Sequence, residues 1–235
     1  MGKRRRKKRS AAASAAAAGV VRRRKVLIGG IGAAVLVVVA VLIAVGLGLG
    51  GSRRSVETMF HEIQGGFTEE GFPYLGSSEA DVVLTEFTDF YCSHCRDYNL
   101  ETEDRFLEDY VATGKVRYVL HYYSNGSPQS LQATDAAMCA ADQGLYFQFQ
   151  RAFFAGPTAT REGFIALAHE LGLDEDEFMA CWDAGRHRNA LVGHIQAAKA
   201  MGISATPSFL VNNQLIVGND PDAVRQAIED ELAAD

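Results

Sequence analysis

The alternation of apolar and polar residues divides this chain into segments of different character. Residues 26–50 contain no charged residue and consist almost wholly of Val, Leu, Ile, Ala and Gly. Shorter apolar runs follow and predict strands at 82–87, 116–120, 208–211 and 214–217. Between these runs, apolar residues recur at helical spacing. The pattern therefore predicts strand, helix, strand, a helical block, two strands and a final helix.

The helices are expected where Gly and Pro mark their ends. The first runs from about Ser93 to Thr113 and stops at Gly114, and the last starts at Pro221. Because the first helix joins the first two strands, these strands are expected to be parallel. Glycines divide the helical block, about residues 128–202, into helices at 128–142, 145–154, 161–171, 174–184 and 187–201.

The N-terminal quarter of the chain has the composition of a membrane anchor. Residues 1–25 carry eleven Lys or Arg and no acid, whereas 29 acids and only ten Lys or Arg follow Ser55. As a helix, residues 26–50 reach roughly 37 Å, which is enough to cross a hydrocarbon core of about 30 Å. The excess of cations before this segment orients the N-terminus to the cytoplasm. We therefore predict a basic cytoplasmic segment (1–25), a single transmembrane anchor (26–50) that contacts lipid, and an extracytoplasmic domain.

Two further interpretations concern the segments beside the anchor. A cleaved signal peptide is the alternative to a retained anchor, but its apolar region is usually only about 7–15 residues long. Residues 51–73 contain several Gly and one Pro, so we expect a linker with room for a short helix near 56–64. The acidic balance of the downstream part argues against nucleic acid as a partner.

Chemistry is expected at Cys92-Ser93-His94-Cys95, where the first strand gives way to the first helix. Two cysteines three positions apart can alternate between dithiol and disulfide, and a helix N-terminus favours a thiolate on the first. A zinc site would need two more ligands at suitable spacing, and haem attachment would need His where Arg96 stands. A redox pair is therefore predicted, without metal or cofactor.

Together, these features resemble the DsbA-like thiol–disulfide oxidoreductases of the thioredoxin superfamily. The resemblance covers about residue 74 to the C-terminus and rests on the element order and on four motifs. These are Leu75-Gly76, the run from Glu86 to Cys95, the run from Gly202 to Phe209, and Asn212-Asn213 with Gly218. The resemblance implies an α/β, thioredoxin-like fold over residues 74–235, with an inserted helical domain and a preceding transmembrane helix.

The resemblance also assigns roles around the cysteine pair. It implies that Cys92 is the nucleophile, that Cys95 is the resolving thiol, and that His94 stabilises the thiolate. An acid at the position of Glu86 lies behind the active site in this family and relays a proton to the resolving thiol. The alternative for Glu86 is an acid at a strand end that faces water. Ser93 stands where the family commonly has Pro, which affects the redox potential.

Two more pairs of residues follow from the same resemblance. Thr206-Pro207 matches the position where the family has a cis proline beside the disulfide, and Thr206 is expected to tune the cysteines. A merely tolerated small residue is the alternative for Thr206. Cys139 and Cys181 are expected to form a structural disulfide in an oxidising compartment, with two separate buried thiols as the alternative.

The expected activity is disulfide donation to exported proteins that carry thiols. A membrane partner, DsbB-like or of the vitamin K epoxide reductase type, would then reoxidise the cysteine pair. A tethered reductase or isomerase is the alternative among enzymes. A chaperone-like binding module with incidental cysteines is the alternative from a different class.

Overall fold

The computed structural model describes residues 55–124, 127–156 and 160–234. The predicted basic segment and membrane anchor, residues 1–50, lie outside these ranges. Among the described residues, no helix combines the length and apolar composition that crossing a membrane requires.

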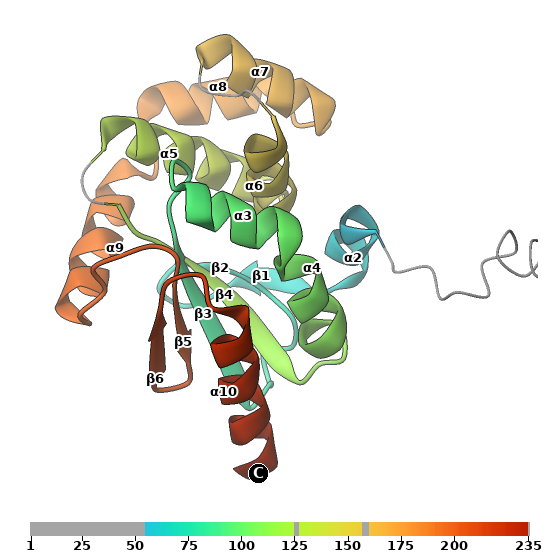
Figure 1. The fold of residues 1–235 in the computed structure, drawn as a ribbon. Helices are drawn as coiled ribbons and strands as arrows, with labels where there is room; N and C mark the ends of the chain where they lie inside the picture. The colour runs from blue at the N-terminus through green and yellow to red at the C-terminus, as the bar shows by residue number, and fades with distance from the viewer. Residues whose placement is uncertain (1–54, 125–126, 157–159, 235) are drawn as a thin grey trace, which may run out of the picture. The chain divides into compact units, whose positions relative to one another are not determined.

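Six strands form one sheet within the described part of the chain, in the order β1-β2-β4-β3-β5-β6 (Figure 1). Central strands β3 and β4 are parallel, as the sequence predicts, and every other neighbouring pair is antiparallel. Their bounds are β1 Gly65–Phe67, β2 Pro73–Leu75, β3 Val82–Thr88, β4 Val116–Tyr122, β5 Ser208–Val211 and β6 Gln214–Val217.

The connection between the two parallel strands is helical but interrupted. It comprises α3 (Ser93–Glu101), α4 (Glu103–Phe106) and a π-helical turn, η1 (Leu107–Val111). The sequence predicts one helix here, and the break falls at Thr102, whose φ and ψ of −124° and −43° depart from helical values. The last helix, α10 (Pro221–Ala234), packs on β3, β5 and β6.

Among the described residues between β4 and β5, the structure has five helices. They are α5 (Pro128–Ala141), α6 (Tyr146–Ala155), α7 (Arg161–Glu170), α8 (Glu175–Ala184) and α9 (Arg188–Ala200). Ser127, Thr160 and Asp174 precede three of these helices, and each side chain accepts a first-turn backbone N–H. Helices α5 to α8 lie beyond one end of the strands, at the top of Figure 1, whereas α9 packs against β4.

The short helix expected near 56–64 is confirmed, but residues 55–73 do not form a linker. Helix α2 (Val56–Glu62) and strand β1 lie within that range, and β2 begins at its end. Four apolar residues of and beside α2 are buried, namely Val56, Met59, Phe60 and Ile63. Their i, i+3, i+4, i+7 spacing is that of a helix with one buried face, so this segment belongs to the folded domain.

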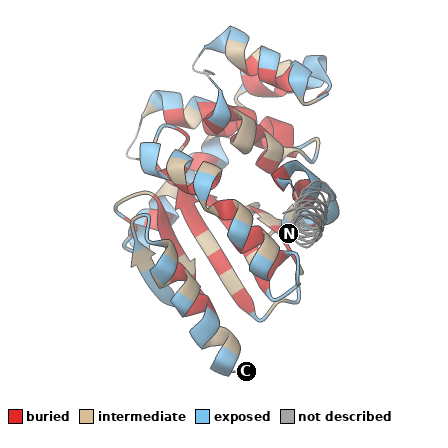
Figure 2. Ribbon diagram, turned by 45° about the vertical axis from the view of Figure 1, so that its right-hand side comes forward, coloured by how far each residue is buried: buried red, intermediate tan, exposed pale blue. Residues whose placement is uncertain are grey.

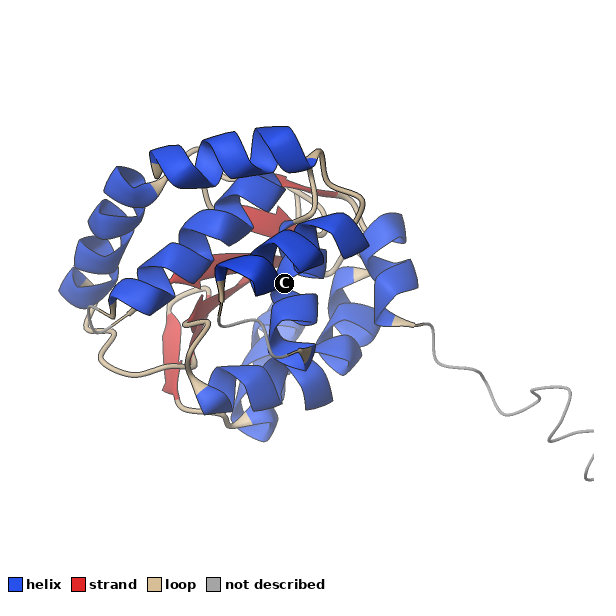
Figure 3. Ribbon diagram, turned by 90° about the horizontal axis from the view of Figure 1, so that it is seen from above, coloured by secondary structure: helices blue, strands red, loops and turns tan. Residues whose placement is uncertain are grey.

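The hydrophobic core lies between the sheet and its helices. Buried residues occupy the helix faces that are turned toward the strands, whereas the outer faces are exposed (Figure 2). Seen from above, helices surround the strands (Figure 3). The core places the end of β3 and the start of α3 at the boundary between sheet and helical block, where the cysteine pair lies.

Candidate active site

Cys92 occupies the N-cap of α3, directly after β3 and a short turn. Its Sγ accepts a hydrogen bond from the backbone N–H of Cys95 at 3.4 Å. Its own N–H donates to the carbonyl of Asp89 at 3.0 Å, which fixes the turn. Cys92 is half-buried, and its N-cap position places its sulfur at the helix N-terminus.

The two thiols of the pair have opposite proton affinities. Hydrogen bonding from the Cys95 side chain, then from the Thr206 side chain and the backbones of Cys95 and His94, lowers the pKa of Cys92 to about 5. Cys95 is fully buried, and this burial raises its pKa well above the usual range. A thiolate therefore forms on Cys92 and not on Cys95 near neutral pH.

The backbone before β5 forms the opposite wall of this site. The Thr206–Pro207 peptide bond is cis, and Pro207 is buried. Cys92 Sγ donates a hydrogen bond to the Thr206 carbonyl oxygen at 3.3 Å. The structure thus brings Thr206 and Pro207 beside the cysteine pair.

Glu86 lies on β3 with only 1% of its surface exposed, so the alternative of an acid facing water is wrong. The Tyr118 hydroxyl donates a hydrogen bond to Glu86 Oε2. Burial raises the pKa of Glu86 to about 7, and the charge of Cys92 acts in the same direction. In turn, the charge of Glu86 contributes to the raised pKa of Cys95.

The two residues between the cysteines face solvent. Ser93 and His94 are both exposed in the first turn of α3. The contribution of His94 to the lowered pKa of Cys92 comes from its backbone N–H.

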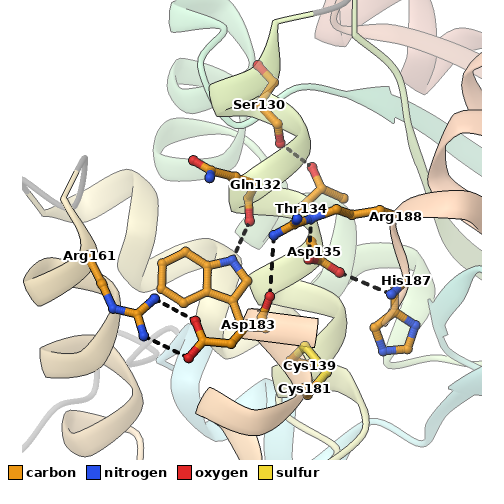
Figure 4. Close-up of polar contacts among 11 residues, drawn as sticks. Ser130, Gln132, Thr134, Asp135, Cys139, Arg161, Cys181, Asp183, His187 and Arg188 are labelled. Atoms are coloured by element: carbon orange, nitrogen blue, oxygen red, sulfur yellow. Dashed lines mark hydrogen bonds and ion pairs between the residues drawn. A yellow bond between two sulfur atoms is a disulfide. The ribbon is translucent and has the colours of Figure 1, made fainter. Parts of the chain in front are cut away.

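Cys139 and Cys181 are joined by a disulfide between α5 and α8, with Cα atoms 5.8 Å apart. Polar contacts surround this bridge in the helical block (Figure 4). Buried Asp135 accepts the His187 backbone N–H at 3.1 Å and Arg188 Nε at 3.0 Å, which ties the start of α9 to α5. The bridge joins α5 to α8, and the contacts of Asp135 join α5 to the start of α9, so together they hold these helices in place.

One group of residues in the described chain has donor atoms close enough to be considered for a metal. The donor atoms of Cys139, Cys181 and His187 lie within 4.8 Å of one another. Both sulfurs are bonded to each other, however, and a disulfide offers no thiolate to a metal ion. The donor set in this state does not fit zinc.

Two further residues of the site, Tyr118 and Glu103, are not among those that the sequence predicts. Tyr118 lies on β4 beside Glu86, and its hydroxyl also lies 3.0 Å from Glu103 Oε1. Glu103 is 1% exposed and accepts a hydrogen bond from Asn99 Nδ2 at 2.7 Å. A sequence signal existed, because Glu103 stands three and four residues before Phe106 and Leu107 on the buried helix face.

Comparison with known proteins gives consistent results. A sequence model of the family described as Thioredoxin matches residues 68–230. A Rickettsia typhi protein named as a protein-disulfide oxidoreductase is 27% identical over 168 residues, which cover 67% of this chain and 62% of that protein. The chain thus spans about three fifths of the length of this curated relative.

Solved structures show the same fold. The oxidised form of BdbD from Bacillus subtilis has a TM-score of 0.64 at 22% identity, covering 73% of this chain and 98% of that one. DsbA from Chlamydia trachomatis has a TM-score of 0.65 at 21% identity, covering 71% and 94%. The fold is therefore thioredoxin-like, of the DsbA kind, with the helical content that the sequence predicts.

Proposed function

The chain belongs to the thioredoxin family, and on that basis we propose that it is a thiol–disulfide oxidoreductase that donates disulfides to exported proteins. One observation carries the proposal: an accessible thiol whose pKa falls to about 5 stands three residues before a buried thiol whose pKa is raised. A stable Cys92 thiolate favours the reduced form of the pair and thus makes the disulfide form a strong oxidant.

The reaction proceeds in two exchanges. A substrate thiolate attacks Cys92 Sγ of the Cys92–Cys95 disulfide, a mixed disulfide forms, and Cys95 leaves and takes up a proton. A second substrate thiolate then attacks the substrate sulfur of the mixed disulfide, which releases the Cys92 thiolate. The substrate loses two electrons, and the cysteine pair gains them. Glu86 is the buried acid that supplies the proton to Cys95.

The neighbouring residues shape this exchange. The cis Pro207 and the backbone before it line Cys92, where an extended substrate strand could pair with the chain. Thr206 tunes the thiolate through its hydrogen bond. The resemblance assigns His94 a stabilising charge beside the thiolate. Ser93 sets the polarity of the exposed turn between the cysteines.

The location and the partner belong to the same proposal. We assign residues 1–25 to the cytoplasm, 26–50 to the membrane and the folded domain to the extracytoplasmic side, on the charge and length of the N-terminal segments. The Cys139–Cys181 disulfide supports an oxidising compartment. A membrane redox partner, DsbB-like or of the vitamin K epoxide reductase type, would reoxidise the pair after each turnover.

Oxidative refolding of a reduced, unfolded model protein tests the activity. The wild-type protein in its disulfide form should restore substrate activity with a stoichiometric loss of its own disulfide. Cys92→Ser should abolish this reaction, whereas a Cys139→Ser/Cys181→Ser double variant should retain it. Unchanged refolding by Cys92→Ser would contradict the proposal. Suppression of aggregation by that variant without thiol exchange would indicate a chaperone instead.

A further inference from the structure

Two buried carboxyl groups share one tyrosine hydroxyl behind the cysteine pair. The Tyr118 hydroxyl hydrogen-bonds Glu86 Oε2 and lies 3.0 Å from Glu103 Oε1. A phenol has a single hydrogen to donate, so it cannot donate to both carboxylates at once. Both contacts are hydrogen bonds only when one carboxyl carries a proton and donates it to the phenol oxygen. In addition to the phenol's own hydrogen, the geometry therefore calls for one proton that the two carboxyl groups share.

The surroundings disfavour two negative charges at this place. Glu86 and Glu103 are each 1% exposed. Arg151 lies 3.9 Å from Glu103 Oε2, but its nearer carboxylate is Asp104 at 3.0 Å. Burial raises the pKa of Glu103 to about 8, and the charge of Glu86 adds to that rise. The other titratable groups that interact with the two carboxyls are Cys92, Cys95, Tyr98 and Tyr146.

A buried acid that serves a buried thiol has to recover its proton. Cys95 is fully buried, and Glu86 beside it is also removed from water. On its other side, Glu103 reaches toward the surface through Asn99 and Arg151, whose side chain is partly exposed. Glu103 thus lies between Glu86 and the solvent-facing part of this network.

We propose that Glu103 is a positioning residue that, through the Tyr118 hydroxyl, shares one proton with Glu86 and keeps Glu86 able to protonate Cys95. This inference rests on the proposed function. In the resting state the shared proton is on Glu103, and Tyr118 donates its own hydrogen to Glu86. As the Cys95 thiolate leaves, Glu103 passes its proton to the tyrosine oxygen, Tyr118 passes its hydrogen to Glu86, and Glu86 gives that proton to Cys95. The net change is one proton moved from Glu103 to Cys95, and the tyrosine is unchanged. Reversal of the same path serves reoxidation.

The test is the pH dependence of the reaction between the oxidised protein and reduced glutathione, for the wild type and Glu103→Gln. In the variant, Glu86 loses the carboxyl that shares its proton and should ionise at lower pH. The pH above which the rate declines should therefore be lower in the variant than in the wild type. Just above neutrality the rate of the variant should be about tenfold below that of the wild type. Glu101→Gln is the matched control, because Glu101 is exposed at the end of α3, and its profile should follow the wild type.

Two further measurements separate this inference from a folding defect and from the proposed function. Tyr118→Phe keeps the ring but removes the hydroxyl, whose hydrogen bond lowers the pKa of Glu86, so it should shift the profile in the opposite direction. Carbon-13 NMR titration of the Glu86 carboxyl should show its pKa lowered in Glu103→Gln. If both variants keep the wild-type pH profile and the wild-type pKa of Glu86, the role of Glu103 is overturned and the proposed function is not affected. Failure of the wild type to exchange disulfides would instead overturn the proposed function.

Discussion

Cys92 Sγ lies 3.3 Å from the carbonyl oxygen of Thr206, although 114 residues separate the two in the chain. This contact joins the start of α3 to the loop that precedes β5 and places the nucleophile against the cis Thr206–Pro207 bond. The same residue also tunes the sulfur, because hydrogen bonding from the Thr206 side chain lowers the pKa of Cys92. Thr206 thus contacts Cys92 in two ways. Its carbonyl contact persists in any substitution at this position, whereas its hydroxyl can be removed by substitution.

Thr206→Val removes that hydroxyl while the shape of the side chain is kept. A hydrogen bond to a charged group is worth about 1.5 kcal/mol, so the pKa of Cys92 should rise by about one unit. The ultraviolet absorbance of the thiolate, followed against pH in the reduced protein, measures this change. Thr206→Ser retains the hydroxyl and should keep the wild-type value. Equal titrations of Thr206→Val and the wild type would exclude the Thr206 hydroxyl and leave the stabilisation of the thiolate to Cys95 and the backbone N–H of His94.

His94→Leu tests the charge of the imidazole separately from the backbone. The backbone N–H that stabilises the Cys92 thiolate survives this substitution, so any change comes from the ring. We expect a higher pKa of Cys92 and a more negative reduction potential, since the reduced form loses a stabilising charge. Equilibration with glutathione measures the potential. An unchanged potential would remove the His94 side chain from the mechanism.

Glu86→Gln should change how stability depends on pH. Burial raises the pKa of Glu86 from an ordinary 4.5 to about 7, so the folded state binds this proton more tightly than the unfolded state. The resulting stabilisation is complete below pH 4.5 and is lost as the pH rises through about 7. The glutamine variant has no such proton and does not lose this stabilisation. From pH 4 to pH 8, its free energy of unfolding should therefore rise relative to that of the wild type by on the order of 3 kcal/mol.

Urea unfolding at several pH values measures this difference, and Glu101→Gln is again the exposed control. Glu103 contributes in the same direction, because its pKa is also raised. The pH dependence of wild-type stability therefore contains contributions from both carboxyl groups. The difference in the free energy of unfolding between the wild type and Glu86→Gln isolates the contribution of Glu86. A constant difference across the pH range would mean that Glu86 ionises normally in the folded protein.

The Cys139–Cys181 bridge should contribute stability without contributing to catalysis. It closes a loop across a sequence separation of 42 residues, for which chain entropy predicts roughly 3–4 kcal/mol. The Cys139→Ser/Cys181→Ser variant should therefore unfold at lower urea concentration, with the pKa of Cys92 unchanged. A shift in that pKa would show that the bridge also shapes the active site.

The sequence predicts those features of the structure that depend on residues close together in the chain. The strands that contain Glu86 and Phe209 are short apolar runs, and glycines such as Gly144 and Gly185 mark helix ends close to where they occur. The cysteine pair could be located for the same reason, since its chemistry depends on two residues at one helix start.

The remaining features depend on contacts that the local pattern does not carry. Strand β1 has three residues and two glycines, so only its pairing with β2 makes it a strand. The helix break at Thr102 turns Glu103 into the core, where Tyr118 from β4 meets it. An acid on an apolar helix face is a visible signal, but its partner 15 residues away is known only from the fold.

The reduction potential of the Cys92–Cys95 pair tests the central claim most directly. The folded part from about Ser55 would be equilibrated in glutathione buffers, its thiols trapped by alkylation and the adducts counted by mass. A strongly oxidising value, near about −120 mV, is predicted because the Cys92 thiolate stabilises the reduced form. A value near about −270 mV, as in thioredoxin, would contradict disulfide donation and indicate a reductase supplied by an electron donor.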